Sequence, residues 1–237
     1  MKNMHSSLQS PPEENTWAKW GGIAALFEAL AYVFGFLMMV FVLAPEEGTD
    51  LSHQEKLQHL LHHQRAYHLW MTIIYIFFGI ALVPLIGAIQ RQWRATDHPL
   101  GQCNSVFGYV WVVLVIASGM IGKVGLTTAG RLYPNDARAG GIVWTTMEAV
   151  QDGLGGGVEI VGGLWVLLVS LLAFRQAKLT PFINILGLIV GSAGVLTIVP
   201  GLTTLGVVFG LAQIVWFVSL GIHLLRMTDY NTDVGLP

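Results

Sequence analysis

Residues 147–164 read MEAVQDGLGGGVEIVGGL. Three carboxylates, those of Glu148, Asp152 and Glu159, and six glycines interrupt a segment that is otherwise apolar. On a continuous α-helix, spacings of four and seven residues place the three acids on one face. A charge near the bilayer centre costs at least ~2.5 to 3.5 kcal/mol, so acids inside a membrane usually face the interior of a bundle and serve a site. The stretch therefore predicts a polar site within a membrane-embedded helix.

The composition supports this membrane setting. Hydrophobic residues make up 54% of the chain and charged residues 11%, and the mean hydropathy is +0.62, which excludes an ordinary soluble domain. The formal net charge of -2 leaves no basic surface, so we expect no nucleic-acid partner. The single cysteine, Cys103, permits no internal disulfide and no cysteine metal site. We therefore expect an all-α, polytopic membrane bundle whose first partner is the lipid bilayer.

Six apolar runs are long enough to cross the ~30 Å hydrocarbon core, which needs about 20 helical residues. They cover residues 17–44, 66–90, 104–126, 146–174, 181–199 and 203–226. The turn residues Pro200 and Gly201 separate the last two, because the combined run is too long for one crossing. Residues 1–16 are expected to form a disordered tail and residues 227–237 a C-terminal tail. Trp17, Tyr67, Trp70, Trp93 and Trp144 lie near the ends of these runs, as expected for interfacial aromatic belts.

Basic residues near the spans predict the orientation. With six spans and a cytoplasmic N-terminus, seven basic residues lie inside and five outside, and the inner connections are the short ones for which the rule works best. Those inside are Lys2, Lys19, Arg91, Arg94, Arg175, Lys178 and Arg226, and those outside are Lys56, Arg65, Lys123, Arg131 and Arg138. Both termini are therefore expected to be cytoplasmic.

The outer side then carries two longer connections. Residues 51–65 combine a leucine stripe with several histidines and predict a short amphipathic helix at the interface. His59 and His63 have the i, i+4 spacing that presents two imidazoles to one metal ion, although a solvated helix without metal explains the same pattern. Residues 127–141 are rich in Gly, Thr and turn residues and predict a loop.

A depth estimate groups three polar residues at one level. Glu159 lies 11 residues beyond Glu148, which is roughly 16 Å along a helix and near mid-membrane. Glu28 in the first run and Gln213 in the last fall at a similar depth. We therefore expect an interior pocket built on Glu28, Asp152, Glu159 and Gln213, able to bind a proton, a cation or a small solute. The alternative is that these side chains are neutral and hydrogen-bond neighbouring helices.

Nearer the outer surface, Glu148 and Asp152 continue the acidic face. Lys123, His68 and Tyr75 on the second and third runs are their candidate partners. Together these five residues would line an outward-open vestibule. A single ion pair between Lys123 and Asp152 explains the same residues without any function.

Glycines recur at spacings that suit helix packing. The pairs Gly153 and Gly157, Gly187 and Gly191, and Gly206 and Gly210 each have three residues between them, which lets helix backbones approach closely in lipid. The run of glycines from 153 to 157 is denser than packing requires, and each weakens a helix by ~1 kcal/mol relative to Ala. A kink, or a backbone opening toward a ligand, is one interpretation of this run.

Catalytic motifs are missing from the sequence. There is no GxSxG, no phosphate-binding GxxxxGK[ST], no GxGxxG after a strand and no HExxH, so nothing favours an enzyme. No cofactor is implied, except that His59, His63 and His68 leave a metal site open as an alternative.

The last third of the chain resembles a family of uncharacterised bacterial integral membrane proteins with six helices. The residues that carry this likeness are Leu171, Leu172, Arg175, Pro181, Leu186 and Gly187, at the junction of the fourth and fifth runs. It covers about the C-terminal 80 residues and, more weakly, residues 17–45. The resemblance implies six spans in a bacterial plasma membrane, and it supplies no known activity.

Three functions fit these observations. The first is a membrane protein that binds or translocates a proton, cation or small solute through the acidic pocket. The second is a structural or accessory subunit that packs against a partner membrane protein or another copy of itself. The third is a membrane-embedded metal enzyme built on the outer histidines and the acidic face.

Overall fold

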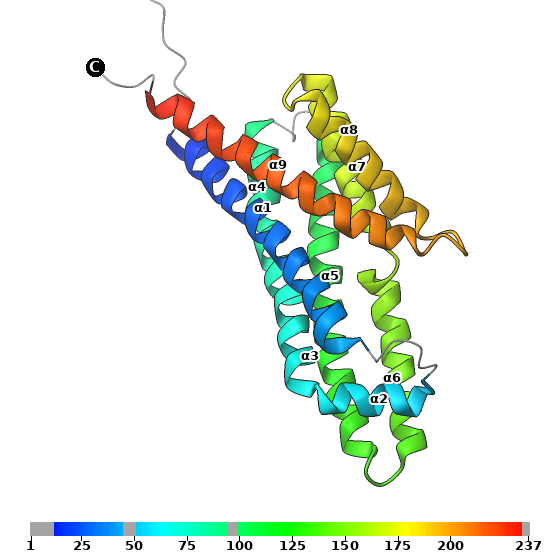
Figure 1. The fold of residues 1–237 in the computed structure, drawn as a ribbon. Helices are drawn as coiled ribbons and strands as arrows, with labels where there is room; N and C mark the ends of the chain where they lie inside the picture. The colour runs from blue at the N-terminus through cyan, green and yellow to red at the C-terminus, as the bar shows by residue number, and fades with distance from the viewer. Residues whose placement is uncertain (1–11, 45–50, 94–98, 234–237) are drawn as a thin grey trace, which may run out of the picture.

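A computed structural model describes residues 12–44, 51–93 and 99–233, and these residues are helical throughout apart from short connections (Figure 1). No β-strand occurs in the described ranges. The α-helices are α1 (Pro12–Met38), α2 (His53–His62), α3 (Gln64–Met71), α4 (Phe78–Gln92), α5 (Pro99–Leu132), α6 (Ala137–Gln151), α7 (Ile160–Gln176), α8 (Pro181–Leu196) and α9 (Leu205–Asp233). Three π-helical turns continue some of them: η1 (Met39–Leu43) after α1, η2 (Thr72–Phe77) between α3 and α4, and η4 (Asp152–Gly156) after α6.

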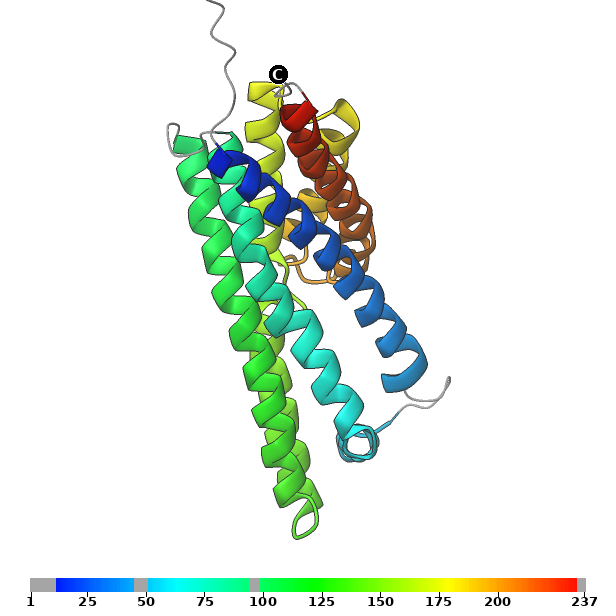
Figure 2. The same ribbon diagram turned by 90° about the vertical axis from the view of Figure 1, so that its left-hand side faces the viewer.

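The helices form an elongated bundle. The first described residues of α1 and the last of α9 lie at the same end, and α2 lies across the other end beside the α5–α6 hairpin (Figure 1). α1 packs along α9 and α4, α7 packs along α8, and α5 contacts α4, α6 and α7. α5 runs the length of the molecule, while α1 diverges from it toward the end where α2 lies (Figure 2). The bundle is therefore closed at one end and splayed at the other.

Among the described residues, five helical segments are long and apolar enough to cross a membrane. They are Asn15–Leu43, Gln64–Gln92, Pro99–Leu132, Ala137–Gln176 and Leu205–Met227, and α8 is a shorter apolar helix. Large apolar side chains such as Leu30, Val113 and Phe174 are exposed on the surface of the bundle, as expected for helices that face lipid. The expectation of an all-helical bundle is therefore confirmed for the described residues, and its apolar helices are compatible with a lipid bilayer.

The helix ends differ from the predicted runs in several places. α1 already begins at Pro12 and α9 continues to Asp233, so parts of both predicted tails are helical, and the rest of each tail lies outside the described residues. α5 continues to Leu132 and α6 begins at Ala137, so the connection is much shorter than the loop predicted over residues 127–141. A glycine read as a loop signal instead brings the two helices together: a methyl group added at Gly140 of α6 would lie 3.1 Å from the Ala129 carbonyl oxygen of α5.

α2 occupies most of the segment predicted as an outer amphipathic helix. Ser52 caps it in a reciprocal arrangement, in which the Glu55 amide donates to Ser52 Oγ and the Ser52 amide donates to Glu55 Oε2 at 2.8 Å. These hydrogen bonds from Ser52 hold the pKa of the exposed Glu55 carboxyl below its usual range. Leu57 is fully buried against the bundle, so this helix is fixed by one apolar face and a cap.

Glycines pack α7 directly on α8. A methyl group at Gly163 would lie 2.6 Å from the backbone nitrogen of Val195, and one at Gly191 would lie 2.7 Å from the carbonyl oxygen of Gly163. Backbone contacts this close require residues without a side chain. The predicted pairs do not all act this way, because nothing lies within 4 Å of a methyl group added at Gly153.

Candidate functional site

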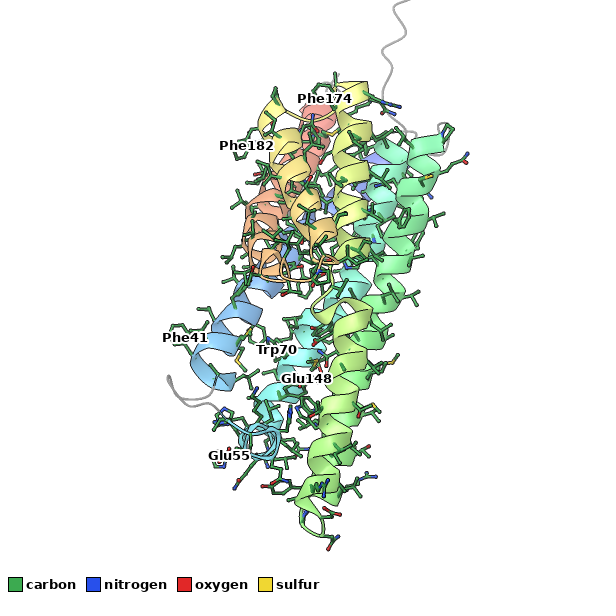
Figure 3. All side chains as sticks on the ribbon, turned by 90° about the vertical axis from the view of Figure 1, so that its right-hand side faces the viewer. Phe41, Glu55, Trp70, Glu148, Phe174 and Phe182 are labelled. Atoms are coloured by element: carbon green, nitrogen blue, oxygen red, sulfur yellow. The ribbon has the colours of Figure 1, made fainter. Side chains whose placement is uncertain are left out.

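A cavity of about 750 Å³ lies in the splayed part of the bundle. Residues of α1, α2, α3, α5, α6 and α9 and of all three π-helical turns line it. In Figure 3, Trp70 and Glu148 lie in the space between α1 and α6, and the Glu55 end of α2 lies beyond them. The cavity is within the range of about 300–1,000 Å³ found for small-molecule sites.

The glycine-rich stretch places the acids of this site by breaking a helix. α6 ends in the turn η4, Gly155 adopts a φ of 119°, and α7 starts only at Ile160. A positive φ of this kind is available to glycine at little cost and to other residues only under strain. The expectation of a continuous helix over residues 146–174 is therefore wrong, and Glu159 does not share one helical face with Glu148 and Asp152.

Other groups satisfy the backbone of the break. The amides of Gly157 and Val158 both donate to the Asp152 carbonyl, at 3.2 and 3.1 Å. The Glu159 amide donates to Thr197 Oγ1 at 2.8 Å, and that hydroxyl donates to the Gly194 carbonyl at 2.7 Å. The break is thus tied to the last turn of α8.

This tie removes the assumption on which the predicted depth of Glu159 was based. The prediction assumed an unbroken helix rising from Glu148 to mid-membrane. The structure instead places Glu159 beside the C-terminal end of α8, at the level where the chain turns toward α9.

Three π-helical turns surround the cavity. Met39 and Leu43 of η1, Ile74 and Tyr75 of η2, and Asp152, Gly155 and Gly156 of η4 all belong to its lining. A π-helical turn widens a helix locally, and such turns occur frequently at functional sites. The wall of the cavity is therefore built from three local irregularities in three separate segments.

The carboxylates that line the cavity are those of Glu148, Asp152 and Glu159. Glu148 and Asp152 are exposed and Glu159 is partly buried. Within residues 12–44, 51–93 and 99–233, no side-chain hydrogen bond joins any of the three to a partner. Glu148 interacts electrostatically with Asp152, Lys56 and His53, and Lys56 of α2 also lines the cavity. Glu148 therefore has a basic neighbour in the cavity lining.

Aromatic side chains form much of the remaining wall. They are Tyr32, Phe36, Tyr67, Trp70, Tyr75, Phe78, Trp111, Trp144 and Phe209. The rings of Trp70 and Tyr75 meet edge to face, with centroids 6.0 Å apart and an angle of 83° between the ring planes. Trp70 Nε1 donates to the Gly35 carbonyl at 3.0 Å, which fixes the indole against α1.

Gln151 holds two of these tyrosines in place. Tyr67 Oη donates to Gln151 Oε1 and Gln151 Nε2 donates to Tyr75 Oη, each at 3.4 Å. Ser118 Oγ of α5 donates to the Gln151 carbonyl at 3.2 Å. The buried Gln151 therefore links α3, η2, α5 and α6 beside the aromatic wall.

Sequence reasoning placed Tyr67, Trp70 and Trp144 in interfacial belts and did not assign them to a site. In the structure Tyr67 and Trp144 are buried and all three line the cavity. Helical spacing could have found part of this wall, because positions 67, 71, 74, 75 and 78 fall on one face.

The predicted pocket is divided by the structure. Asp152 and Glu159 line the cavity, whereas Glu28 and Gln213 are fully buried beside it and do not. Tyr32 connects the two groups, because it lines the cavity and its hydroxyl donates to Gln213 Oε1 at 3.2 Å. Neither carboxylate oxygen of Glu28 has a hydrogen-bond partner among the described residues.

The predicted vestibule is also only partly assembled. Glu148 and Tyr75 line the cavity, and Lys123 and His68 do not. Lys123 Nζ donates to Thr72 Oγ1 at 2.6 Å instead of pairing with Asp152. His68 Nε2 lies 3.3 Å from Gln64 Nε2.

The outer histidines lie close to one another. The rings of His59 and His63 have centroids 4.6 Å apart, and His63 Nδ1 lies 3.1 Å from the His59 carbonyl oxygen. No cluster of three or more His, Cys, Asp or Glu residues suited to a metal ion occurs in the part of the chain that the structure describes. His59 lies in α2 and lines the cavity, whereas His63 follows the last residue of α2 and does not line it.

Comparisons with protein-family models, with curated proteins and with solved structures gave no match to this chain.

Proposed function

We propose that this chain is a six-span protein of the bacterial plasma membrane, with both termini cytoplasmic, that binds a small solute in the cavity and moves it across the bilayer. The resemblance of its C-terminal third to bacterial six-helix membrane proteins supports the assignment to that family. In this proposal α8 is the additional crossing beside the five longer segments. Its 16 residues span about 24 Å, slightly less than the ~30 Å hydrocarbon core.

One observation carries the solute-binding function. The cavity joins carboxylates without hydrogen-bond partners among the described residues to an aromatic wall, and three π-helical turns border it. Charged groups inside a membrane protein are costly and mark sites and pathways. Broken helices that present their ends to a central site are also a recurrent device of secondary transporters. This combination favours solute transport over a purely structural role.

The shared end of the bundle supports the orientation. α1 starts and α9 finishes at that end, together with the connection between α7 and α8 (Figure 1). An even number of crossings requires such an arrangement. The cavity and α2 would then face the outside, as the distribution of basic residues predicts.

Cysteine labelling tests the orientation. In a Cys103→Ala background, Asn135→Cys in the α5–α6 connection should react with a membrane-impermeant maleimide in intact cells. Lys178→Cys in the α7–α8 connection should react only after permeabilisation. The opposite pattern would invert the topology, and labelling of both sites in intact cells would refute six crossings.

A solute screen tests the binding function. The purified protein in lipid nanodiscs would be melted with cationic, anionic and uncharged solutes of up to drug size. A solute at 100 times its Kd should stabilise the folded state by about 2.7 kcal/mol. Glu148→Gln should weaken this stabilisation, and Glu55→Gln, the same change on the exposed side of α2, should not. Copurification of a stoichiometric partner with no stabilising solute would instead favour the accessory-subunit function.

A further inference from the structure

We propose that the solute recognised by the cavity is an organic cation, with an ammonium-type or similarly delocalised charge carried on an aromatic or alkyl body. This inference rests on the proposed solute-binding function and names its ligand class. It follows from the presence of Asp152 and Glu148 together with the rings of Trp70 and Tyr75 in the lining of one cavity.

The charges on the wall select a cation. Three carboxylates line the cavity, and Lys56 is the only lysine or arginine among its described lining residues. Lys56 interacts with Glu148, which leaves Asp152 without a basic partner among the described residues. An anionic solute would meet like charges and unpaired acids, an arrangement that specific sites use to reject the wrong ligand.

The helix break adds to this selectivity. α6 ends at Gln151, so the negative end of its dipole and its last carbonyls lie next to Asp152. α7 presents its positive end to the same break, on the side where Glu159 occupies its N-cap position. The two half-helices therefore favour positive charge on the α6 side, where Asp152 and Glu148 lie.

The aromatic wall suits a cation with an apolar body. Trp is the best cation–π partner, and Trp70 with Tyr75 forms a corner of two nearly perpendicular rings. The indole is held by the Gly35 carbonyl and the phenol by Gln151, so both rings are fixed before a ligand arrives. Fixed walls reduce the entropy lost on binding.

A bare metal ion fits less well. Calcium takes six to eight oxygen ligands and magnesium demands an octahedral set, usually completed by water. The described residues hold no cluster of three or more His, Cys, Asp or Glu side chains suited to a metal. A volume of about 750 Å³ with nine aromatic residues in its lining also far exceeds what such an ion needs. The size and the apolar lining both point to an organic ligand.

A pair of ions with the same shape and opposite charge tests the inference. Radiolabelled tetraphenylphosphonium and tetraphenylborate would each be equilibrated by dialysis with protein in nanodiscs and with empty nanodiscs. We expect the protein to retain the cation above the empty-nanodisc level and not to retain the anion. Asp152→Asn should weaken cation binding at least tenfold, Trp70→Ala should weaken it several-fold, and Glu55→Gln should leave it unchanged.

The outcomes separate the inference from the function beneath it. Equal retention of both ions, or preference for tetraphenylborate, would overturn the cation selectivity while leaving a solute cavity. Retention of neither ion would also overturn it, and the solute screen would then decide whether the cavity binds anything. An Asp152→Asn protein that keeps its melting temperature and its full cation affinity would remove Asp152 from the site.

Discussion

Two neighbouring regions of this bundle, the contact between α7 and α8 and the break between α6 and α7, use glycine for opposite purposes. Between α7 and α8, Gly163 and Gly191 let two backbones touch, and a methyl group at either position would collide with main-chain atoms. At the break between α6 and α7, a methyl group at Gly153 or Gly155 would meet nothing within 4 Å. Glycine gives close packing in the first region and backbone freedom in the second. The difference teaches that a closely packed helix pair supports the open break beside it.

The largest effect on stability should come from adding a methyl group at the contact between α7 and α8. Gly163→Ala would place a methyl group 2.6 Å from Val195 N and 2.8 Å from the Gly191 carbonyl oxygen, both backbone atoms that cannot rotate away. We expect a loss of about 1–3 kcal/mol or more in the free energy of unfolding, measured by denaturant titration in mixed micelles. Gly153→Ala is the matched control, and a gain of up to about 1 kcal/mol is expected there. Equal losses of stability from Gly163→Ala and Gly153→Ala would abolish the contrast between the α7–α8 contact and the α6–α7 break.

The next largest effect on stability should come from removing the hydrogen bonds that join the α6–α7 break to the end of α8 through Thr197. Thr197→Val keeps the shape of a buried side chain but removes the acceptor for the Glu159 amide and the donor to the Gly194 carbonyl. A loss of about 1–3 kcal/mol is expected, because a buried amide is left without a partner. In the control Thr146→Val, an exposed hydroxyl that bonds the Ile142 carbonyl is removed, and the melting temperature should barely change. If Thr197→Val also leaves the melting temperature nearly unchanged, this contact does not couple the α6–α7 break to α8.

The loss of stability from backbone strain at the α6–α7 break should be smaller than the two preceding losses. Gly155→Ala forces a residue with a Cβ to hold a φ of 119°, at a cost of roughly 1–2 kcal/mol, without any steric contact. Because Gly155 lines the cavity, the variant should lose cation affinity as well as stability. Thermal melting and dialysis binding of tetraphenylphosphonium measure the two effects. Unchanged stability would show that the break relaxes easily and is not fixed by this glycine.

The smallest effect concerns the cap of α2 at the open end. The pKa of Glu55 is lowered in the folded protein, so its hydrogen bonds with Ser52 stabilise α2 above the unfolded pKa and are lost as the pH falls through the lowered folded value. Hydrogen exchange of the first α2 amides should therefore speed up as the medium becomes acidic, after correction for intrinsic rates. In Glu55→Gln this acid-dependent step should disappear. A step that persists would assign it to another group.

The sequence predicted the class of the molecule better than its site. Long apolar runs that contain few charged residues identify a helical membrane bundle, because lipid requires every backbone group to be hydrogen-bonded within the protein. The acids at 148, 152 and 159 were found because charges stand out against apolar neighbours. The break before Glu159 was missed because the prediction assumed one helix through the glycine-rich positions 153–157, and hydropathy does not indicate a residue with positive φ.

The sequence did not predict the aromatic wall of the cavity, for a different reason. Trp70 and Trp144 near the ends of apolar runs match both an interfacial belt and a cavity wall, and the sequence alone does not distinguish the two. Gln151 was passed over because its importance lies in the two tyrosines that it joins, which are 84 and 76 residues away in the chain. Glu28 and Gln213 were found as polar residues at one depth, but the sequence did not indicate that both would lie outside the cavity lining, with Tyr32 linking Gln213 to it.

The volume of the cavity has a thermodynamic consequence. At roughly 30 Å³ per molecule, about 750 Å³ has room for on the order of 25 water molecules, many of them against aromatic rings. A ligand that displaces them removes apolar surface from water, which lowers the heat capacity of the system. Calorimetric titrations over a range of temperatures should therefore show a binding enthalpy that becomes steadily more favourable on warming. The slope of that line would measure how much of the aromatic wall the ligand covers.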